Sequence, residues 1–393
     1  MDIKVFDFEI SPKLLIDSKM NNYEINIDDK YENGYSRVVT ENGSCKVAFI
    51  KDTFNNNNYN LHPEYQRRIR WSEQKRSKLI ESLIINIPIP PIFLYEYDFD
   101  KYEVMDGLQR LSAIIDYYGN KYKLTGLVEW GELNGMYYSD LPEKIKEGIG
   151  RRQIQTITLL KESANNLDSA DRIKRLVFER LNTGGIKLNG QEIRNALFAG
   201  NGNKMCNELS KHKLFRKLWG IAEVNEDSFL DDQEYEDDDT LLKNNLYKRM
   251  GDVELVLRFF SMSFFNDFNT PLDEFLDNTL INLNSYSNLE LKLLKNVFCK
   301  SIDNAYKLFL DKAFCFYKGN RWGNAIKMIY DPMMQVLSQY SLDNITTNAE
   351  NNIKKLADFY NNNLKLFDGK HQSKDDIKDR IDEISKFIIG IIK

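Results

Sequence analysis

Residues 106–110, with the sequence Asp-Gly-Leu-Gln-Arg, combine residue types that bind phosphate. Apolar residues at helical spacing follow them and predict a helix that begins near residue 107. A helix N-terminus presents free backbone N–H groups and a partial positive charge. Gly107 would let a phosphate approach the backbone, Arg110 would grip its oxygens in a fork, and Gln109 would donate a further hydrogen bond. The pattern therefore predicts an anion site at a strand–turn–helix junction.

A simpler interpretation needs no ligand. Asp106 would cap the helix and pair with Arg110 four residues later. Against it, an arginine in the first turn opposes the helix dipole, which favours an anion shared by the arginine and the helix. The spacing alone leaves both interpretations open.

A basic stretch precedes this junction. Residues 65–71 read Tyr-Gln-Arg-Arg-Ile-Arg-Trp, and residues 61–80 hold six basic and two acidic side chains. Arginines interleaved with aromatic rings suit phosphate contact and base stacking, so Arg68, Arg70 and Lys75 are predicted to contact nucleic acid. The alternative is a basic face exposed to solvent.

A third polar stretch surrounds a pair of glycines. Asn182, Gly184 and Gly185 lie in an Asn-Thr-Gly-Gly turn, and Glu192 and Arg194 follow within ten residues. Such a turn is usually a helix stop, because glycine tolerates positive φ. The polar residues that flank it make it a candidate for the same phosphate site.

The elements that position these residues follow from local signals. Ser72 predicts the N-cap of a helix that the prolines at 88–91 end. Two strands, 92–95 and 102–105, are predicted to form a hairpin that leads into residue 106. A further helix, with Leu176 and Val177 on its inner face, would end at the Asn-Thr-Gly-Gly turn. Asn189 and Glu192 have the spacing of a capping box.

The chain changes character after residue 220. Residues 223–239 carry ten acidic groups, and the sequence beyond them has helical periodicity, with Pro271 and Pro332 expected as breaks between helices. We predict an α/β (α+β) N-terminal domain followed by an all-α C-terminal domain. The expected boundaries are an N-terminal extension at 1–59, the phosphate-binding domain at 60–220, an acidic linker at 221–245 and the helical domain at 246–393.

Composition narrows the functional classes. The chain has 393 residues and a net charge of −5, which disfavours a surface coated throughout with nucleic acid. Three histidines and four scattered cysteines lack the spacings of zinc sites, histidine-centred nucleases or a disulfide framework. Neither a signal peptide nor a membrane span is visible, so a cytoplasmic protein is expected.

Taken in order, three segments resemble the N-terminal domain family of GmrSD-type modification-dependent restriction enzymes. They are LHPEYQRRIRWSEQKRSKLIESLIINIPIPPIFLYE (61–96), VMDGLQRLSAI (104–114) and FERLNTGGIKLNGQEIRNALF (178–198), and RMGDVELVLRFF (249–260) is similar to a segment of longer members. The resemblance implies a fold of ParB/sulfiredoxin type. It also implies nucleotide hydrolysis in antiviral defence, linked to an Asp-Gly-Gln-Gln-Arg motif.

Carried over residue by residue, the resemblance makes Asp106 and Gln109 catalytic, with Mg²⁺ bound by Asp106 through the nucleotide. It places Gly107 and Arg110 on the phosphate. Gln66 and Arg67 would complete the nucleotide pocket. Position 108 departs from the pattern, because this chain has Leu where the family has Gln, and that puts hydrolysis in doubt. The histidine-rich nuclease domain that often follows in the family is missing, since residues 265–393 contain a single histidine.

The leading expectation is therefore an NTP-binding, Mg²⁺-dependent component of a DNA-directed restriction-type defence system. The nucleotide is unknown, and the partner would be DNA or a DNA-reading or nuclease subunit; an oligomer is an open alternative. A second interpretation is a non-catalytic sensor that binds DNA or a partner through Arg67, Arg68 and Arg70. A third is a nuclease whose site the sequence does not reveal.

Overall fold

A computed structural model describes most of the chain. The described residues are 38–61, 71–161, 174–178, 180–181, 189–222, 241, 243–264, 271–342, 347–367 and 374–392. The contacts within the chain group the described residues into two compact units, with the boundary between Leu197 and Phe198. We call residues 38–197 the sheet unit and residues 198–392 the helical unit. These parts confirm the predicted α/β N-terminal region and helical C-terminal region.

The sheet unit contains one mixed five-stranded sheet in the order β1-β5-β3-β4-β2. The strands are β1 (Thr40–Lys46), β2 (Tyr59–Asn60), β3 (Ile92–Asp98), β4 (Lys101–Asp106) and β5 (Gln153–Leu159). β3 pairs antiparallel with β4 and parallel with β5, while β1 pairs antiparallel with β5. The hairpin predicted before residue 106 is therefore confirmed, and it occupies the centre of the sheet.

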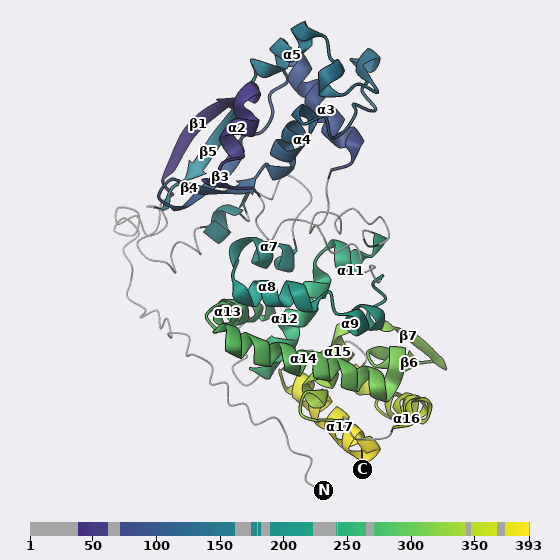
Figure 1. The fold of residues 1–393 in the computed structure, drawn as a ribbon. Helices are drawn as coiled ribbons and strands as arrows, with labels where there is room; N and C mark the ends of the chain where they lie inside the picture. The colour runs from purple at the N-terminus through teal and green to yellow at the C-terminus, as the bar shows by residue number, and fades with distance from the viewer. Residues whose placement is uncertain are drawn as a thin grey trace. The chain divides into compact units, whose positions relative to one another are not determined.

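Helices cover one face of this sheet (Figure 1). They are α2 (Ile50–Phe54), α3 (Glu73–Ile85), α4 (Leu108–Tyr118) and α5 (Glu143–Gly150). Alternate strand residues such as Leu94 and Val104 join Ile80 of α3 and Ile114 of α4 in one buried cluster, as expected for strands with one face on the core. This packing fixes α4 against the strand that precedes it.

Local signals account for the two helices that flank the hairpin. Ser72 is the N-cap of α3, and its hydroxyl accepts a hydrogen bond from the Lys75 N–H at 3.4 Å. Helix α4 begins at Leu108, as the apolar spacing predicted. The sheet unit itself begins before the expected boundary at residue 60, since β1 belongs to its sheet and α2 packs into its core. The polar composition of this early segment concealed them, because β1 lies at the sheet edge and is almost wholly exposed.

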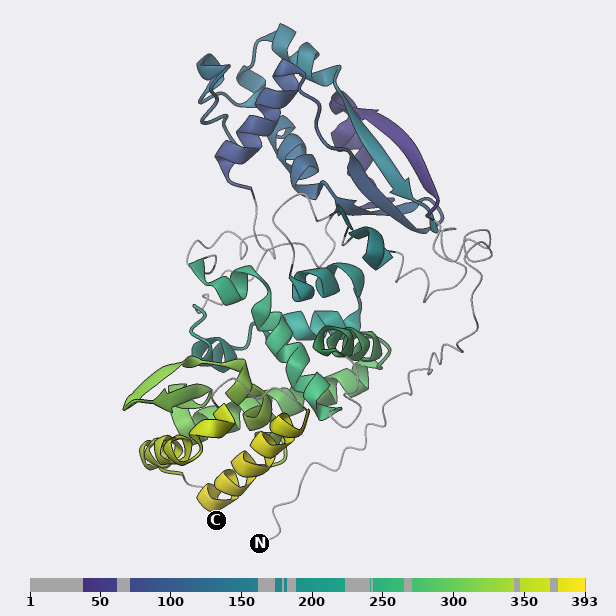
Figure 2. The ribbon, with the colours of Figure 1, turned by 180° about the vertical axis from the view of Figure 1, so that it is seen from behind.

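The helical unit is built around α12 (Gly251–Ser263), which is the segment 249–260 singled out in the sequence. Only three of its thirteen residues escape burial. It packs against α8 (Asn201–Leu209), α13 (Leu272–Asn284) and α15 (Lys327–Leu337), and Figure 2 shows the arrangement from behind. The remaining main helices are α9 (Lys213–Leu218), α11 (Asn245–Lys248), α14 (Asn288–Phe309), α16 (Ala349–Asn362) and α17 (Lys374–Ile392).

Two features of the helical unit differ from the expectation. A hairpin, β6 (Cys315–Lys318) and β7 (Arg321–Ala325), interrupts the helices. Its strands are too short for alternation to reveal them. Pro332 was expected to be a break, and that was wrong, because it lies inside α15; Pro271 is the N-cap of α13 and does separate helices. None of the helices in the described ranges is long and apolar enough to cross a membrane.

Candidate functional site

The junction between β4 and α4 places the Asp-Gly-Leu-Gln-Arg residues around one helix start. β4 ends at Asp106, Gly107 is the N-cap of α4 with φ of 99°, and the helix begins at Leu108. A positive φ favours glycine, since any other side chain is strained there. Asp106 therefore is not the cap that the simpler interpretation assigned to it.

The space beside Gly107 is already filled. A Cβ at this position would lie 2.4 Å from Ile92 Cδ1 and 2.9 Å from Arg110 Nη2. The missing side chain thus lets the Arg110 guanidinium and a core residue approach the turn. The predicted role of Gly107, an open approach for phosphate, stays a prediction.

Arg110 makes two hydrogen bonds at this turn. Its Nη2 donates to Asp106 Oδ2 at 2.7 Å and to the Pro91 carbonyl at 3.1 Å. The arginine side chain is 12% exposed, whereas that of Asp106 is 43% exposed. Within the described residues, the buried Nε of Arg110 has no hydrogen-bond partner. The i,i+4 ion pair of the simpler interpretation is therefore present, and the buried Nε is left without a partner among the described residues.

The first turn of α4 has no side-chain cap among the described residues. Its backbone N–H groups and the guanidinium bring positive charge to the same place. The Asp106 carboxylate offsets part of that charge, because it lies next to both. The site is thus a cationic helix start balanced by one partly exposed carboxylate.

Gln109 ties this helix start to the chain that leads into α3. Its Oε1 accepts the Trp71 N–H at 3.0 Å, and the Trp71 carbonyl accepts from Arg76 Nε at 3.0 Å. Since this bond engages the amide oxygen, the NH₂ group is the remaining polar part of the side chain. Gln109 can then position a ligand by donating a hydrogen bond.

Lys75 lies beside the same tryptophan. Its Nζ sits 4.5 Å from the centre of the Trp71 ring, in a cation–π contact. The contact of Lys75 with nucleic acid stays a prediction.

Several predicted site residues lie outside the described residues. These are Gln66, Arg67, Arg68, Arg70, Asn182, Gly184 and Gly185. Two others lie in α7 (Gly190–Leu197), where Glu192 and Arg194 are both buried. The predicted capping box is confirmed, because Glu192 N–H donates to Asn189 Oδ1 and Glu192 Oε2 accepts from the Asn189 N–H, both at 2.8 Å. Glu192 thus has a structural task at the start of its own helix.

Lys174 is a buried charge that the sequence analysis missed. It forms an ion pair with Glu103 of β4, with both side chains 10% exposed, and its Nζ lies 5.2 Å from the centre of the Tyr95 ring. Leu176 was expected to face inward, and that was wrong: it is 42% exposed. Lys174 takes the buried position instead of Leu176, because Glu103 on the sheet provides a carboxylate for it. Local periodicity cannot reveal such a partner. This pair anchors the segment before the Asn-Thr-Gly-Gly turn to the hairpin that ends at Asp106.

A second missed residue, Glu81 of α3, holds a loop in place. Its Oε1 accepts the N–H groups of Val128, Glu129 and Trp130 at 3.1, 2.9 and 3.0 Å. Three consecutive N–H groups around one carboxylate oxygen form an anion-binding nest. The nest is occupied by the protein itself, and it leaves Val128 77% exposed.

Cysteine chemistry finds no support in the described residues. Burial raises the pKa of the Cys206 thiol to about 12, and burial also raises the pKa of Cys299 and Cys315. A catalytic thiol needs a lowered pKa. No group of three or more His, Cys, Asp or Glu side chains among the described residues is arranged to hold a metal ion.

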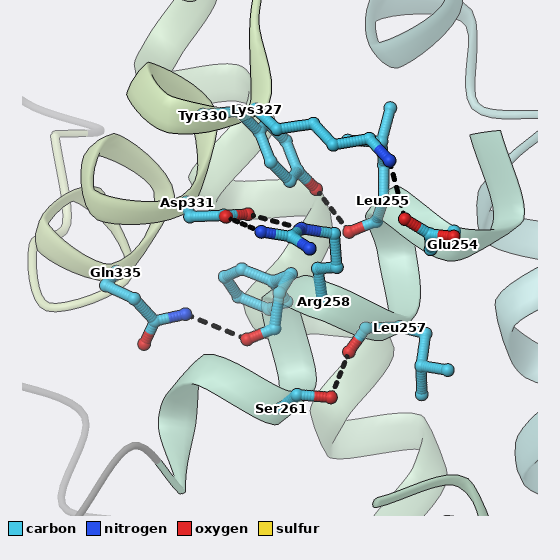
Figure 3. Close-up of polar contacts among 10 residues, drawn as sticks. Glu254, Leu255, Leu257, Arg258, Ser261, Lys327, Tyr330, Asp331 and Gln335 are labelled. Atoms are coloured by element: carbon cyan, nitrogen blue, oxygen red, sulfur yellow. Dashed lines mark hydrogen bonds and ion pairs between the residues drawn. The ribbon is translucent and has the colours of Figure 1, made fainter. Parts of the chain in front are cut away.

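The helical unit has a separate buried polar cluster, shown in Figure 3. Arg258 of α12 pairs with Asp331 of α15 through two nitrogens, with Nε at 3.1 Å from Oδ1. The Tyr330 hydroxyl donates to the Leu255 carbonyl at 3.0 Å, and Gln335 Nε2 donates to the Phe259 carbonyl at 2.8 Å. These contacts join α12 to α15, and they give the cluster a structural role.

Comparison with known proteins bears on the sheet unit. Residues 50–199 match the sequence profile of the family described as GmrSD restriction endonuclease, N-terminal domain. This region is similar to the GmrSD N-terminal domain. The match confirms the resemblance of the three segments between residues 61 and 198, and it includes Asp106 to Arg110, α3 and α7. No curated protein and no solved structure gives a significant match to the chain.

Proposed function

We propose that this protein is a component of a restriction-type defence system directed at DNA, and that its sheet unit binds a nucleoside triphosphate at the start of α4. The similarity to a restriction endonuclease domain supports the defence role. The nucleotide assignment rests on the geometry around Arg110.

The observation that carries the assignment is the charge arrangement at this helix start. Arg110 is held beside Gly107 with a buried Nε that lacks a partner in the described part of the chain, next to a first turn without a side-chain cap. A phosphate that replaced the Asp106 carboxylate would exchange one charge-assisted bond for another and gain the helix N–H groups. Binding would therefore cost little of the existing network.

Mg²⁺ fits this arrangement only in company with the nucleotide. Mg²⁺ is usually held by one or two carboxylates together with substrate phosphates. Asp106 supplies one carboxylate that is 43% exposed, and it would be released from Arg110 when phosphate binds. The ion would neutralise phosphate charge. Within this proposal Gln66 and Arg67 complete the pocket, and Asn182, Gly184, Gly185 and Arg194 contribute to it.

A nucleotide-binding sensor without hydrolysis is the second candidate, and Leu108 favours it. This side chain packs against the hydrophobic core, so it cannot do what the family's glutamine amide would do. The protein would then bind nucleotide and signal to DNA or to a partner subunit.

The test is nucleotide binding by the full chain with Arg110→Ala. We expect affinity for the bound NTP to fall about 10- to 150-fold, because a hydrogen bond to a charged group contributes ~1.5–3 kcal/mol. Binding of ATP, GTP, CTP and UTP with Mg²⁺ is measured by calorimetry, and phosphate release separates hydrolase from sensor.

The matched control is Arg151→Ala, which removes an exposed arginine of the same unit. It should bind like the wild type. A thermal unfolding curve establishes that Arg110→Ala is folded. If the folded Arg110 variant keeps wild-type affinity, or if no NTP binds the wild type, the assignment is wrong.

A further inference from the structure

The hairpin β6–β7 stands at the edge of the helical unit, beside α16 (Figures 1 and 2). Its two-residue turn consists of Gly319 and Asn320, with φ of 61° and 59°. Two successive positive φ values are typical of a type I′ turn, which gives a narrow, twisted ribbon. The four residues at the tip, 318–321, are all exposed.

The tip brings two cations directly opposite each other. Lys318 pairs in register with Arg321, the last pair before the turn. Like charges in this position destabilise a hairpin. Neither cation forms an ion pair with any residue that the structure describes, and the sequence from Lys312 to Tyr330 contains no Asp or Glu. The tip thus keeps an unfavourable charge pair that an external anion would relieve.

The base of the hairpin is rigid. Phe316 packs on Tyr360 and Phe367, with ring centres 5.3 and 6.0 Å apart, and Trp322 packs on Tyr317 at 5.0 Å. These rings fasten the ribbon to α16 and the segment that follows it. The cations are therefore presented on a fixed support, which lowers the conformational entropy lost when a partner binds.

We propose that the β6–β7 hairpin is a second contact surface for duplex DNA, with its tip entering the major groove. The B-form major groove admits a two-stranded ribbon, whereas the major groove of duplex RNA is too narrow. Lys318 and Arg321 reach the phosphates or guanine edges, and the exposed amide of Asn320 faces the bases. Since its exposed residues are glycines, amides and cations, the tip is unsuited to a membrane.

This surface belongs to the helical unit, so it is independent of the nucleotide assigned to the sheet unit. The net charge of −5 agrees with binding through local basic surfaces, because the chain as a whole does not attract DNA. Helix α16 adds no net charge beside the hairpin, as its lysines 354 and 355 are matched by Glu350 and Asp358.

The experiment measures binding of the full chain to a labelled 20-base-pair duplex by fluorescence anisotropy at several salt concentrations. The variant is Lys318→Ala with Arg321→Ala. Each phosphate contact contributes about 0.9 to the slope of log K against log salt, so the double variant should lose about 1.8. Affinity at 0.1 M salt should then fall about 60-fold if counterion release is the whole effect.

The control is Lys292→Ala with Lys378→Ala, which removes two exposed lysines from α14 and α17. It should retain the wild-type slope. The measurements on the hairpin variant and on the control variant are repeated in a chain that also carries Arg68→Ala and Arg70→Ala. This is needed because the basic stretch 65–71 is itself a predicted DNA contact. The hairpin variant should show an unfolding temperature at or above that of the wild type, since a repulsion has been removed.

Equal slopes for the hairpin and control variants would overturn the proposal. The proposal would also be overturned if Arg68→Ala with Arg70→Ala abolished duplex binding entirely. The wild type could also bind duplex RNA or heparin as tightly as duplex DNA, with the same loss of affinity in the hairpin variant. The hairpin would then bind polyanions in general, and its entry into the DNA major groove would be rejected.

Discussion

Gly107 and Arg110 share one volume at the start of α4. The nearest guanidinium nitrogen, Nη2, lies 2.9 Å from where a Cβ at position 107 would be, so a side chain at this position would crowd the arginine. An alanine at position 107 would push the arginine away from Asp106 in addition to straining the backbone. A loss of function in a glycine variant would therefore report on the arginine as well.

Position 108 separates the hydrolase from the sensor. In Leu108→Gln, an amide replaces a half-buried apolar side chain, at a cost of about 1 kcal/mol in the free energy of unfolding. If the chain is a weakened hydrolase, phosphate release should rise about fivefold, the value of one neutral hydrogen bond of ~1 kcal/mol.

Leu108→Met keeps an apolar side chain of similar volume and should leave the rate unchanged. A wild-type rate that is already substantial, and that the glutamine does not alter, would show that position 108 is not critical.

Sequence reasoning at the residue scale succeeded where partners are close along the chain. The Asp106–Arg110 pair and the Asn189–Glu192 box both follow from a fixed spacing on a helix. The Trp71–Gln109 bond joins residues 38 positions apart, and Lys174 meets a carboxylate 71 positions away. Such contacts are decided by the packing of the sheet, which no local pattern encodes.

Helices α12 and α15 are joined by the buried pair Arg258–Asp331. Removing one partner leaves an uncompensated charge in the core, so Asp331→Ala should lower the free energy of unfolding by about 3–5 kcal/mol. Chemical denaturation of the full chain, followed by helical circular dichroism, measures the change.

A nearby, more exposed pair supplies the comparison. Lys327 pairs with Glu254, and its side chain is 43% exposed, so Lys327→Ala should cost no more than about 1 kcal/mol. Replacing both members of the buried pair, with Arg258→Met and Asp331→Leu, should recover most of the loss. If Asp331→Ala cost no more than Lys327→Ala, the buried pair would not be a structural clamp.

Elements with strong caps or long apolar periods could be predicted from sequence, as α3, α4 and the β3–β4 hairpin show. The short β6–β7 hairpin was missed, because strands of four and five residues carry little alternation, although a Gly-Asn pair between two such runs is typical of a hairpin turn. Pro332 was misleading because α15 is buried from Ile329 to Leu337, and such tertiary packing can outweigh the local preference of proline to end a helix.

At the scale of the whole molecule, the acidic stretch has a different setting from the one expected. Ile221 before it and Leu241 and Tyr247 after it form one buried cluster, and all three belong to the helical unit. The stretch therefore interrupts one unit, whereas the sequence suggested a linker between two. Composition identifies a charged block and does not reveal what its ends are attached to.

Limited proteolysis tests this arrangement. We expect the first cut within residues 231–239, since a block of like charges resists packing. Because the flanking residues pack together, the two fragments should elute as one species in native buffer and separate only in denaturant. Fragments that part in native buffer would contradict the shared cluster, and a first cut within residues 60–200 would contradict the exposed acidic stretch.

Helix α3 is bonded to its neighbours at several places, among them its start, through Trp71 and Gln109, and its third turn, through Glu81. Between them the helix is a stiff rod of about 12 Å. A ligand that moved the Gln109 amide would tilt this rod, and the three amides on Glu81 would follow. The displacement would then appear at Val128 and Trp130, on a surface that no ligand at the start of α4 needs to touch. In mechanical terms α3 would then act as a lever, with its input at Trp71 and its output at the 128–130 loop.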